Sequence, residues 1–409
     1  MSENNSISNS KALQKKVEHN GKIDVIIPAY KAQKTILRTM ASIVSQSIVD
    51  DLNVIIVNDC CPNGDYHEIV DMYSPYVSIK EIKHEKNAGP GVARQTGIDA
   101  GENEFFTCID ADDTFNGAIA LEILRTAIEE MPPQAQQVGP GMPPPQHIYQ
   151  CASGTFLQLG EDLKQIVPHQ NDMVWMFGKL YRREFINRYK IRFNTTRANE
   201  DTGFNTMVRL LCNNEREQIR FVQEPVYYWH NKEDSITRIN DGQYGHDQCF
   251  CGWTDNMIYA IEHVRSYRPF DGAAQQWTVN CMMQLYYYFI EVYARDKVFA
   301  DQDWEYVKKF YHRCYKKIEE DINDQVFSEM FSMCSLEKWG SGSLIGIIPH
   351  IGIREFMDKL KKEEYNKNDI YKIWKRMWKD PETRKLMQNN IDCGVCPADY
   401  IKGDSTINL

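Results

Sequence analysis

The chain has 409 residues, of which 42% are hydrophobic and 25% are charged, and its formal net charge at pH 7 is −10. This composition is that of an ordinary globular protein and excludes a disordered chain or a fibrous repeat. The negative balance gives no general attraction to nucleic acid or anionic membranes, and no apolar run reaches the roughly 18 residues of a membrane-spanning helix.

The first 21 residues are polar and rich in Ser and Asn. They predict a mobile leader rather than a signal peptide, because an apolar core segment is missing. Without a secretory signal, the twelve cysteines favour reduced thiols and a cytoplasmic location. Cys393 and Cys396 could complete a zinc site with Cys249 and Cys251, but the two pairs lie far apart in the sequence and one CxxC pair is weak evidence.

Strands and helices alternate between residues 24 and 109. Apolar strands are predicted at 24–30, where Pro28 ends the strand, and at 54–57, 77–84 and 105–109. Helices are predicted at 36–44, at 66–73 and after the Gly-rich turn that opens 87–101. The strands are apolar on both faces, as in a parallel sheet covered by helices on both sides. The sequence therefore predicts an α/β fold.

The chain changes character twice after residue 130. Prolines crowd residues 132–146, which predicts a surface loop inserted into the domain, because proline removes hydrogen-bond donors. Mixed elements return at 151–238, and from about 242 the chain is helical in character and rich in aromatic residues. We expect a catalytic domain at 22–241 and a smaller, mainly helical domain at 242–409.

Polar residues follow three of the predicted strands. Pro28, Ala29 and Tyr30 end the first strand, Asp59 follows the second, and the run from Asp110 to Asp113 follows the fourth. Ligands of such sheets bind at the carboxyl ends of the strands. The three groups should therefore meet at one edge.

Asp110, Asp112 and Asp113 repel one another unless a counter-charge is present. A divalent cation shared with a substrate diphosphate would neutralise them. The alternative is structural: Asp113 could cap a helix over 118–127.

Two further acidic groups have similar alternatives. Asp59 could bond its own turn, or it could accept the imide N–H of a pyrimidine base. Asp201, in the run Asn-Glu-Asp-Thr, could cap a helix that begins there, or it could act as a general base whose charge the helix dipole maintains. In the segment 227–238, His230, Ser235 and Arg238 suit a diphosphate or a solvated loop.

Six segments in this order resemble glycosyltransferase family 2, whose fold is GT-A. They are VIIPAY, VIIVNDCCPNG, NAGPGVARQTGIDAG with FFTCIDADD, GKLYRREFI, NEDTGFNTMVRLL and YYWHNKEDSITR. The resemblance covers residues 23–238. It implies a Rossmann-like, mostly parallel sheet flanked by helices, and a metal-dependent, inverting glycosyltransferase that uses Mn²⁺ or Mg²⁺ and a nucleotide-sugar, with a UDP-sugar favoured.

The resemblance also implies roles for individual residues. Pro28, Ala29 and Tyr30 would line the nucleotide pocket and Asp59 would read the base. Arg94 would lie near the diphosphate, Asp110 would contact ribose or metal, and Asp112 would ligate the metal. Asp201 would deprotonate the acceptor hydroxyl, and residues 179–183 would help to shape the acceptor side. His230, Ser235 and Arg238 would close over the diphosphate.

Two positions depart from the family pattern. Asn58-Asp59-Cys60-Cys61 stands where the family usually has Asp-Asp-Gly-Ser, and His230 stands where Arg is usual. The second departure weakens phosphate binding, although His230 could ligate the metal instead.

The sequence leaves three alternatives for the acceptor and for whether the protein is catalytic. A glycan is the first expectation. A hydroxylated base in DNA is the second, because residues 353–386 form a basic stretch interleaved with aromatics. A non-catalytic sugar-nucleotide or glycan-binding module with the same fold is the third.

Overall fold

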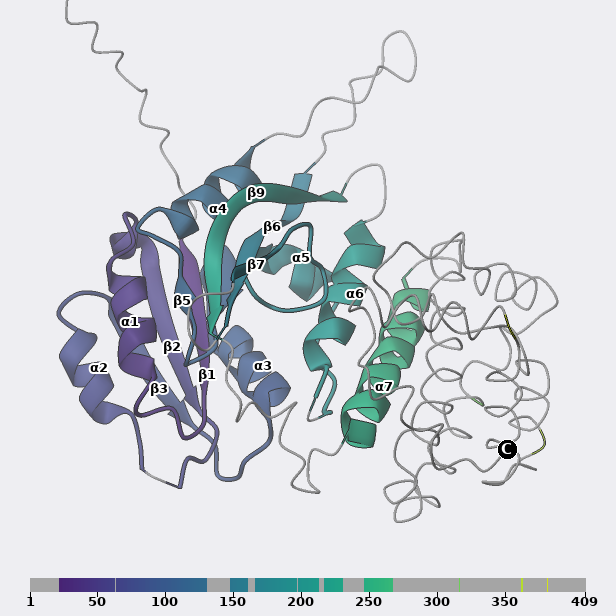
Figure 1. Ribbon diagram of the computed structural model, residues 1–409, viewed down its shortest axis with the longest axis horizontal. Coiled ribbons are helices and arrows are strands. Elements are labelled where there is room, and N and C mark those ends of the chain that lie inside the picture. The colour runs from purple at the N-terminus through teal and green to yellow at the C-terminus, as the bar shows by residue number, and fades with distance from the viewer. Residues whose placement is uncertain are drawn as a thin grey trace, which may run out of the picture.

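The computed structural model describes residues 22–62, 64–130, 148–160, 166–196, 198–212, 217–230 and 246–267, together with residues 316, 362 and 381. Over these ranges the strands form one sheet of nine, in the order β3-β2-β1-β4-β8-β6-β9-β5, with β7 paired to β6 (Figure 1). The structure is therefore mixed α/β, as predicted.

The first half of the sheet is parallel and follows the predicted alternation. Its strands are β1 (Ile23–Ala29), β2 (Leu52–Asn58), β3 (Ser78–Lys83) and β4 (Phe105–Cys108). The connections carry α1 (Ile36–Val44), the short 3₁₀ helix η1 (Val49–Asp51), α2 (His67–Tyr73) and α3 (Pro90–Ala100). The carboxyl ends of β1, β2 and β4 consequently lie side by side.

The prediction that Pro28 ends the first strand is wrong. β1 runs on to Ala29 and pairs Pro28 with Val57 of β2. On the other side, the pairing with β4 stops at Ile26. A proline fits here because, among the described residues, no strand pairs with β1 on that side beyond Ile26.

The second half of the sheet mixes directions. β8 (Lys179–Arg182) is antiparallel to β4, and β6 (Ile148–Leu159) is antiparallel to β8. The long β9 (Glu217–His230) is parallel to β6, while β5 (Thr114–Phe115) and β7 (Ile166–His169) are antiparallel additions. The helices of this half are α4 (Ala120–Glu129), α5 (Arg183–Arg188), α6 (Glu200–Cys212) and α7 (His246–Arg265).

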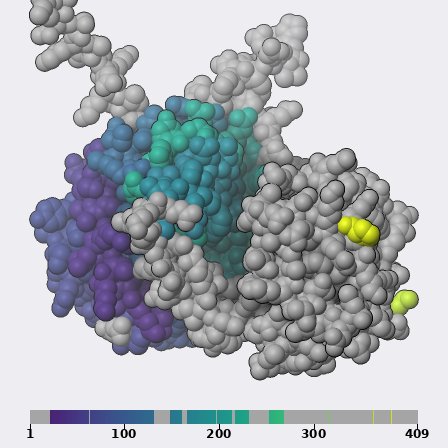
Figure 2. All heavy atoms as spheres, in the orientation of Figure 1, coloured from purple at the N-terminus to yellow at the C-terminus, as the bar shows by residue number. Residues whose placement is uncertain are grey.

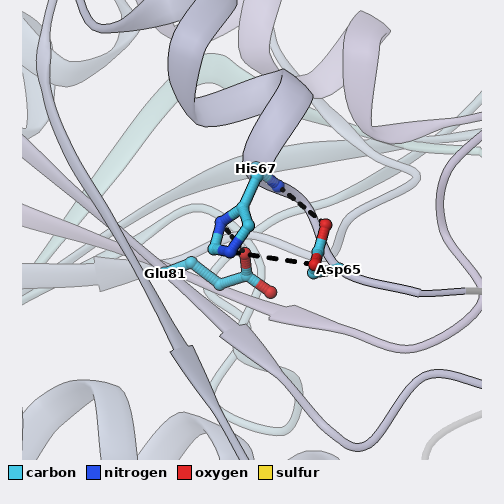
Figure 3. A group of neighbouring side chains, drawn as sticks. All are labelled: Asp65, His67 and Glu81. Atoms are coloured by element: carbon cyan, nitrogen blue, oxygen red, sulfur yellow. Dashed lines mark hydrogen bonds and ion pairs between the residues drawn. The ribbon is translucent and has the colours of Figure 1, made fainter.

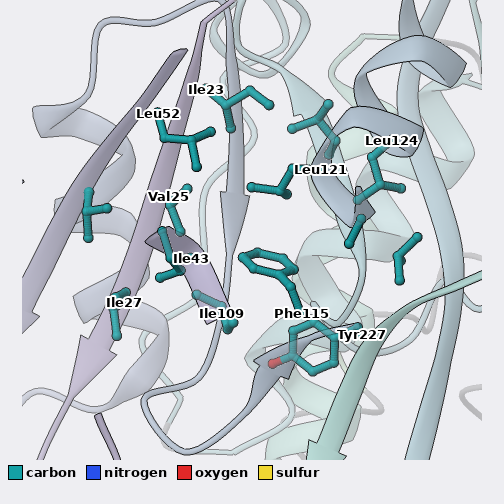
Figure 4. Close-up of a cluster of buried hydrophobic side chains, with 14 of the residues drawn as sticks. Ile23, Val25, Ile27, Ile43, Leu52, Ile109, Phe115, Leu121, Leu124 and Tyr227 are labelled. Carbon is teal, nitrogen blue, oxygen red and sulfur yellow. The ribbon is translucent and has the colours of Figure 1, made fainter. Parts of the chain in front are cut away.

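Two hydrophobic cores cover the two faces of the sheet. Val25 and Ile27 of β1 pack with α1 and α4 in one core (Figure 4). Ile26, whose side chain points the other way, packs with α3, α5 and α6 in the second. This alternation explains why β1 is apolar throughout: both faces of a buried parallel strand need apolar side chains. Figure 2 shows the described parts of both halves as one continuous body.

α7 lies against α6 (Figure 1). Ala260 and Val264 of α7 share a core with Phe204 and Met207 of α6. The helices approach closely at Gly203, where a Cβ atom would lie 2.9 Å from Cβ of Asn256. The first helix after residue 242 thus packs into the core of the preceding domain. The predicted boundary itself stays a prediction, since the chain beyond 267 is almost entirely outside the described residues.

A buried ion pair joins distant segments at the amino edge of the sheet. Asp24 is fully buried and accepts hydrogen bonds from Arg183 Nη2 at 2.6 Å and from the side chains of Asn53 and Asn103 at 2.9 and 2.8 Å. We call Asp24, Asn53, Asn103 and Arg183 the amino-edge clamp. Every oxygen of its carboxylate has a partner, which is what a buried charge requires.

Candidate active site

Three aspartates follow β4 at the carboxyl edge. Asp110, Asp112 and Asp113 each offer a carboxylate oxygen, and these oxygens lie within 4.8 Å of one another. Asp110 and Asp112 are partly exposed, whereas Asp113 is buried. Thr39 of α1 supports the turn by donating its hydroxyl to the Asp113 carbonyl at 2.8 Å. Hard oxygen ligands at this spacing fit Mg²⁺ or Mn²⁺.

Asp113 is the buried member of this cluster, and two groups of β9 bond its carboxyl group. Its carboxylate accepts the Tyr227 hydroxyl at 2.8 Å and the backbone N–H of His230 at 2.9 Å. Burial, with the charges of Asp110 and Asp112, raises the pKa of Asp113 well above its ordinary value. α4 begins after Ile119 with no side-chain cap, so the capping alternative for Asp113 is wrong. Asp113 therefore fastens β9 to the turn, while Asp110 and Asp112 are the more exposed members of the cluster.

Arg94 of α3 connects the cluster to α6. Its guanidinium donates to Asp110 Oδ1 at 2.7 Å and to Glu200 Oε1 at 2.5 Å, and both Arg94 and Glu200 are buried. Burial alone would lower the pKa of Arg94, but the carboxylates of Asp110 and Glu200 raise it well above its ordinary value. Arg94 is therefore a permanent cation that holds two carboxylates from different elements together.

Asp201 follows Glu200 in the first turn of α6, as predicted for a helix that begins at this run. Its pKa is raised to about 7 by burial first, then by the negative charges of Glu200 and Asp110, against the opposing effect of Arg94. The helix dipole favours the ionised form, but burial acts in the opposite direction and raises the pKa of Asp201. A group with this pKa can accept a proton near neutrality.

Asp59, after β2, is buried and bonded to the loop that enters α3. It accepts backbone N–H groups of Ala88 at 2.9 Å and Gly89 at 2.8 Å. His84 Nδ1 lies 2.8 Å from Oδ1 of Asp59, and His84 Nε2 lies 2.9 Å from the Thr96 hydroxyl. Because a carboxylate only accepts, Nδ1 of His84 carries a proton and donates it to Asp59. These bonds fix the orientation of Asp59; its contact with a base stays a prediction.

The structure explains the departure at Asn58. The buried Asn58 amide donates to Glu81 Oε1 at 2.8 Å and accepts the backbone N–H of Cys61 at 2.9 Å. An aspartate here would face the Glu81 carboxylate, and the repulsion would disfavour it. Figure 3 shows the other side of Glu81, where His67 lies between Glu81 at 3.2 Å and Asp65 at 3.7 Å. The two carboxylates approach opposite ring nitrogens, an arrangement that suits ion pairing better than one shared metal.

The end of β1 borders Asp59. The Ala29 carbonyl accepts the Asp59 backbone N–H at 2.9 Å. Pro28 is half-buried, and Tyr30 is 43% exposed with the Lys31 ammonium 5.1 Å from its ring centroid. The three residues predicted to line a nucleotide pocket are thus brought beside Asp59.

Other predicted residues lie elsewhere. His230 ends β9 with Nε2 3.1 Å from the Thr114 hydroxyl, beside the acidic cluster but not within it. Lys179 is completely buried and donates to Asp172 at 2.7 Å, and Arg183 belongs to the amino-edge clamp. Arg183 therefore does not shape an acceptor side at the carboxyl edge. Ser235, Arg238, the segments 132–146 and 353–386, and Cys393 with Cys396 lie outside the described residues.

Sequence reasoning missed His84, Tyr227 and the pairing of Glu200 with Arg94. His84 had a usable signal, since it ends a predicted strand of the parallel sheet. Tyr227 and Glu200 had none, because their partners are 114 and 106 residues away in the chain.

Comparison with known proteins finds similarity to one family over part of the chain. The model of glycosyl transferase family 2 matches residues 24–190. Over these residues the chain is similar to glycosyl transferase family 2. This range holds Asp59, Arg94 and the acidic cluster, while Asp201 lies just beyond it.

The relatives are distant. The chain is 26% identical over 230 residues to the uncharacterized glycosyltransferase EpsJ of Bacillus subtilis, covering 53% of this chain and 63% of EpsJ. It is 24% identical over 242 residues to the uncharacterized glycosyltransferase YibD of Escherichia coli, covering 54% and 64%. The chain thus spans less than two thirds of the length of these relatives.

Solved structures show the same GT-A fold. Residues 1–349 of S. aureus TarS, crystallised with UDP-GlcNAc, match with a TM-score of 0.60 at 15% identity, over 87% of this chain and 90% of that one. The same TarS segment with UDP matches with a TM-score of 0.56. At this identity the likeness concerns the fold. In the part of the chain that the structure describes, no helix is both long and apolar enough to cross a membrane.

Proposed function

We propose that this protein is a metal-dependent, inverting glycosyltransferase that moves a sugar from a UDP-sugar to a hydroxyl of a glycan. One observation carries the proposal: Arg94 bonds both Asp110 and Glu200. This supports the proposal because Asp110, which we propose as a cation ligand, then lies near the start of α6, where Asp201 follows Glu200. A transfer between two substrates requires such proximity.

The residues proposed to bind the donor suit a nucleoside diphosphate. Asp59 and Tyr30 stand together at the ends of β2 and β1, where a base would lie. Asp110 and Asp112 would hold Mn²⁺ or Mg²⁺ beside the diphosphate. Such a cation, when bound, stabilises the negative charge that develops on the leaving group. A fold like this one holds UDP-GlcNAc in TarS, and we carry a uridine donor over on that ground. None of the similarities supports DNA as a partner.

Asp201 supplies the base. Its carboxylate accepts the proton of the acceptor hydroxyl while the acceptor oxygen forms a bond to the anomeric carbon. The bond from that carbon to the diphosphate oxygen breaks, and the electron pair leaves with the nucleoside diphosphate. One displacement inverts the anomeric configuration. A pKa of about 7 suits this task, since the base must be free near neutral pH and basic enough to take the proton.

The test is a screen of UDP-, GDP- and CDP-sugars for thermal stabilisation of the full chain, with Mn²⁺, with Mg²⁺ and with EDTA. Ligand binding to the folded state raises the melting temperature by mass action. We expect stabilisation by a UDP-sugar that EDTA abolishes, followed by slow release of free sugar with an inverted anomeric centre. Equal stabilisation with EDTA would contradict the metal dependence, and a retained anomeric centre would contradict the single displacement.

A further inference from the structure

A row of aromatic side chains starts at the acidic cluster and runs along β9 and the loop before β8. The Tyr227 ring, whose hydroxyl bonds Asp113, stacks on Phe177 with centroids 5.2 Å apart. Phe177 lies 5.5 Å from Trp229, and Trp229 lies 6.1 Å from Trp175. The row is therefore continuous with the candidate active site.

The two tryptophans differ from the other members in exposure. Tyr227 and Phe177 are buried, whereas Trp175 and Trp229 are only half-buried. Their indole planes are tilted by 33° to one another. Beyond them, His169 lies 5.5 Å from Trp175 and its Nε2 lies 3.0 Å from the Gln158 amide oxygen. Apolar ring surface with polar groups at its border is the make-up of a small-ligand site.

The loop that carries Trp175 is held from two sides. Asp172 accepts the backbone N–H of Trp175 at 3.1 Å and is itself paired with the buried Lys179 at 2.7 Å. Asn205 of α6 donates to the carbonyl oxygens of Val174 at 3.0 Å and Trp175 at 2.9 Å. The backbone at Trp175 is thus held in place, which lowers the entropy cost of ordering this loop around a ligand.

The hydrogen bonds from Asn205 also relate the position of Trp175 to that of Asp201, the proposed general base. Asn205 follows Asp201 by four residues on α6, so both side chains lie on one face of that helix, one turn apart. Trp175 is therefore tied to the face of α6 that presents Asp201, and Trp229 reaches the acidic cluster through Phe177 and Tyr227.

From this geometry we propose that Trp175 and Trp229 form the acceptor subsite and bind a pyranose ring by stacking, so that the acceptor is a saccharide rather than an acyclic polyol. The inference rests on the proposed function. One face of many pyranose rings carries mainly C–H groups, which pack against an indole, while the ring hydroxyls point outward to polar partners such as His169 and Gln158. An acyclic polyol offers no such face.

Binding of simple acceptor fragments tests this inference. The methyl glycosides of glucose, galactose and N-acetylglucosamine, together with ribitol 5-phosphate, are titrated by NMR into the full chain with UDP and Mn²⁺. The variants are Trp175→Leu, Trp229→Leu and their Phe counterparts. The control is Trp253→Leu, since Trp253 packs against Met257 and Ile261 of α7.

We expect at least one methyl pyranoside to bind the wild type. Either Leu variant should weaken it about tenfold, while the Phe variants and the control stay within about threefold. UDP affinity should not change, which also shows that the variants fold. The inference is overturned if no pyranoside binds the wild type, if the Leu variants bind normally, or if ribitol 5-phosphate binds as well as the pyranosides. A wild type that fails to bind UDP contradicts the proposed function instead.

Discussion

At the scale of single residues, Asp201 shows how strongly surroundings decide chemistry. A carboxylate in the first turn of a helix is stabilised by the dipole, typically by less than about 1 kcal/mol. Around Asp201, burial and the neighbouring charge of Glu200 outweigh that effect and raise its pKa to about 7. The sequence placed Asp201 at a helix start, but only the fold shows that Glu200 is turned toward Arg94.

The first prediction concerns turnover. Transfer by the wild type should rise as the pH passes through about 7, because the base must be deprotonated. Asp201→Asn cannot accept the proton and should lower the turnover number at least roughly a hundredfold. UDP affinity should stay near wild type. Asp99→Asn, at an exposed position of α3, is the control. Normal turnover in Asp201→Asn would refute the assignment.

The second prediction concerns stability and follows from the same pKa. Between the ordinary value of 3.8 and about 7, the folded state holds a proton on Asp201 that the unfolded state has lost. The contribution of this group to stability therefore falls as the pH rises through that window. Asp201→Asn should melt at a higher temperature than wild type at pH 8, and this advantage should shrink toward pH 4. Melting curves at five pH values measure it; an advantage independent of pH would contradict the raised pKa.

The third prediction separates two neighbouring aspartates. Asp112→Ala should abolish the Mn²⁺-dependent part of UDP binding and leave the melting temperature of the free protein unchanged. Asp113→Ala should instead cost about 1–3 kcal/mol of stability, because Tyr227 and the N–H of His230 lose their acceptor. Calorimetric UDP titrations with Mn²⁺ and with EDTA, beside thermal melts, distinguish the two. Equal effects of both changes in both assays would contradict the separation.

At the scale of helices and strands, the parallel half of the sheet was predictable and the other half was not. β1, β2 and β4 are short apolar runs separated by predicted helices, and they pair in regular register. β6 and β9 instead pair across 69 residues at Ile148 and Glu217, and their register shifts at three places, so no regular alternation marks them. Pro225 lies inside β9, opposite Thr155, where a sequence argument would have ended the strand.

The fourth prediction concerns the packing of α3 on β1. A Cβ atom at Gly97 would lie 2.3 Å from Cγ2 of Ile26. Gly97→Ala should therefore destabilise the protein by about 1–3 kcal/mol, despite the better helix propensity of alanine. Ile26→Ala removes the side-chain atoms that the new Cβ would meet. The double variant should therefore lose less stability than the sum of the losses in the two single variants. Urea titrations measure all three variants, and strict additivity would show that the two residues do not compete for space.

At the scale of the whole molecule, the packing of α7 determines how much of the C-terminal part can be removed without unfolding the protein. A protein ending at 241 loses Ala260 and Val264 from the core that they share with Phe204 and Met207. We expect this truncation to unfold or aggregate, whereas one ending at 267 should still bind UDP with Mn²⁺. If the region beyond 267 selects the acceptor, the longer truncation should release sugar from the donor but transfer none. Circular dichroism and donor-release assays test this, and a stable protein ending at 241 would contradict the role of α7.

The amino-edge clamp lies away from the turns that carry the candidate site, so the two regions should differ in their tolerance to substitution. Asp24 and Arg183 lie 159 positions apart in the chain, at the end of the sheet opposite to the turns after β1, β2 and β4. Random variation in the turns after β1, β2 and β4 therefore leaves this fastening untouched. A library diversified at positions 30–31, 60–61 and 111–112 should yield soluble protein far more often than one diversified at the four clamp residues. Substitutions at the carboxyl edge should therefore be tolerated independently of the hydrogen bonds that hold the amino edge.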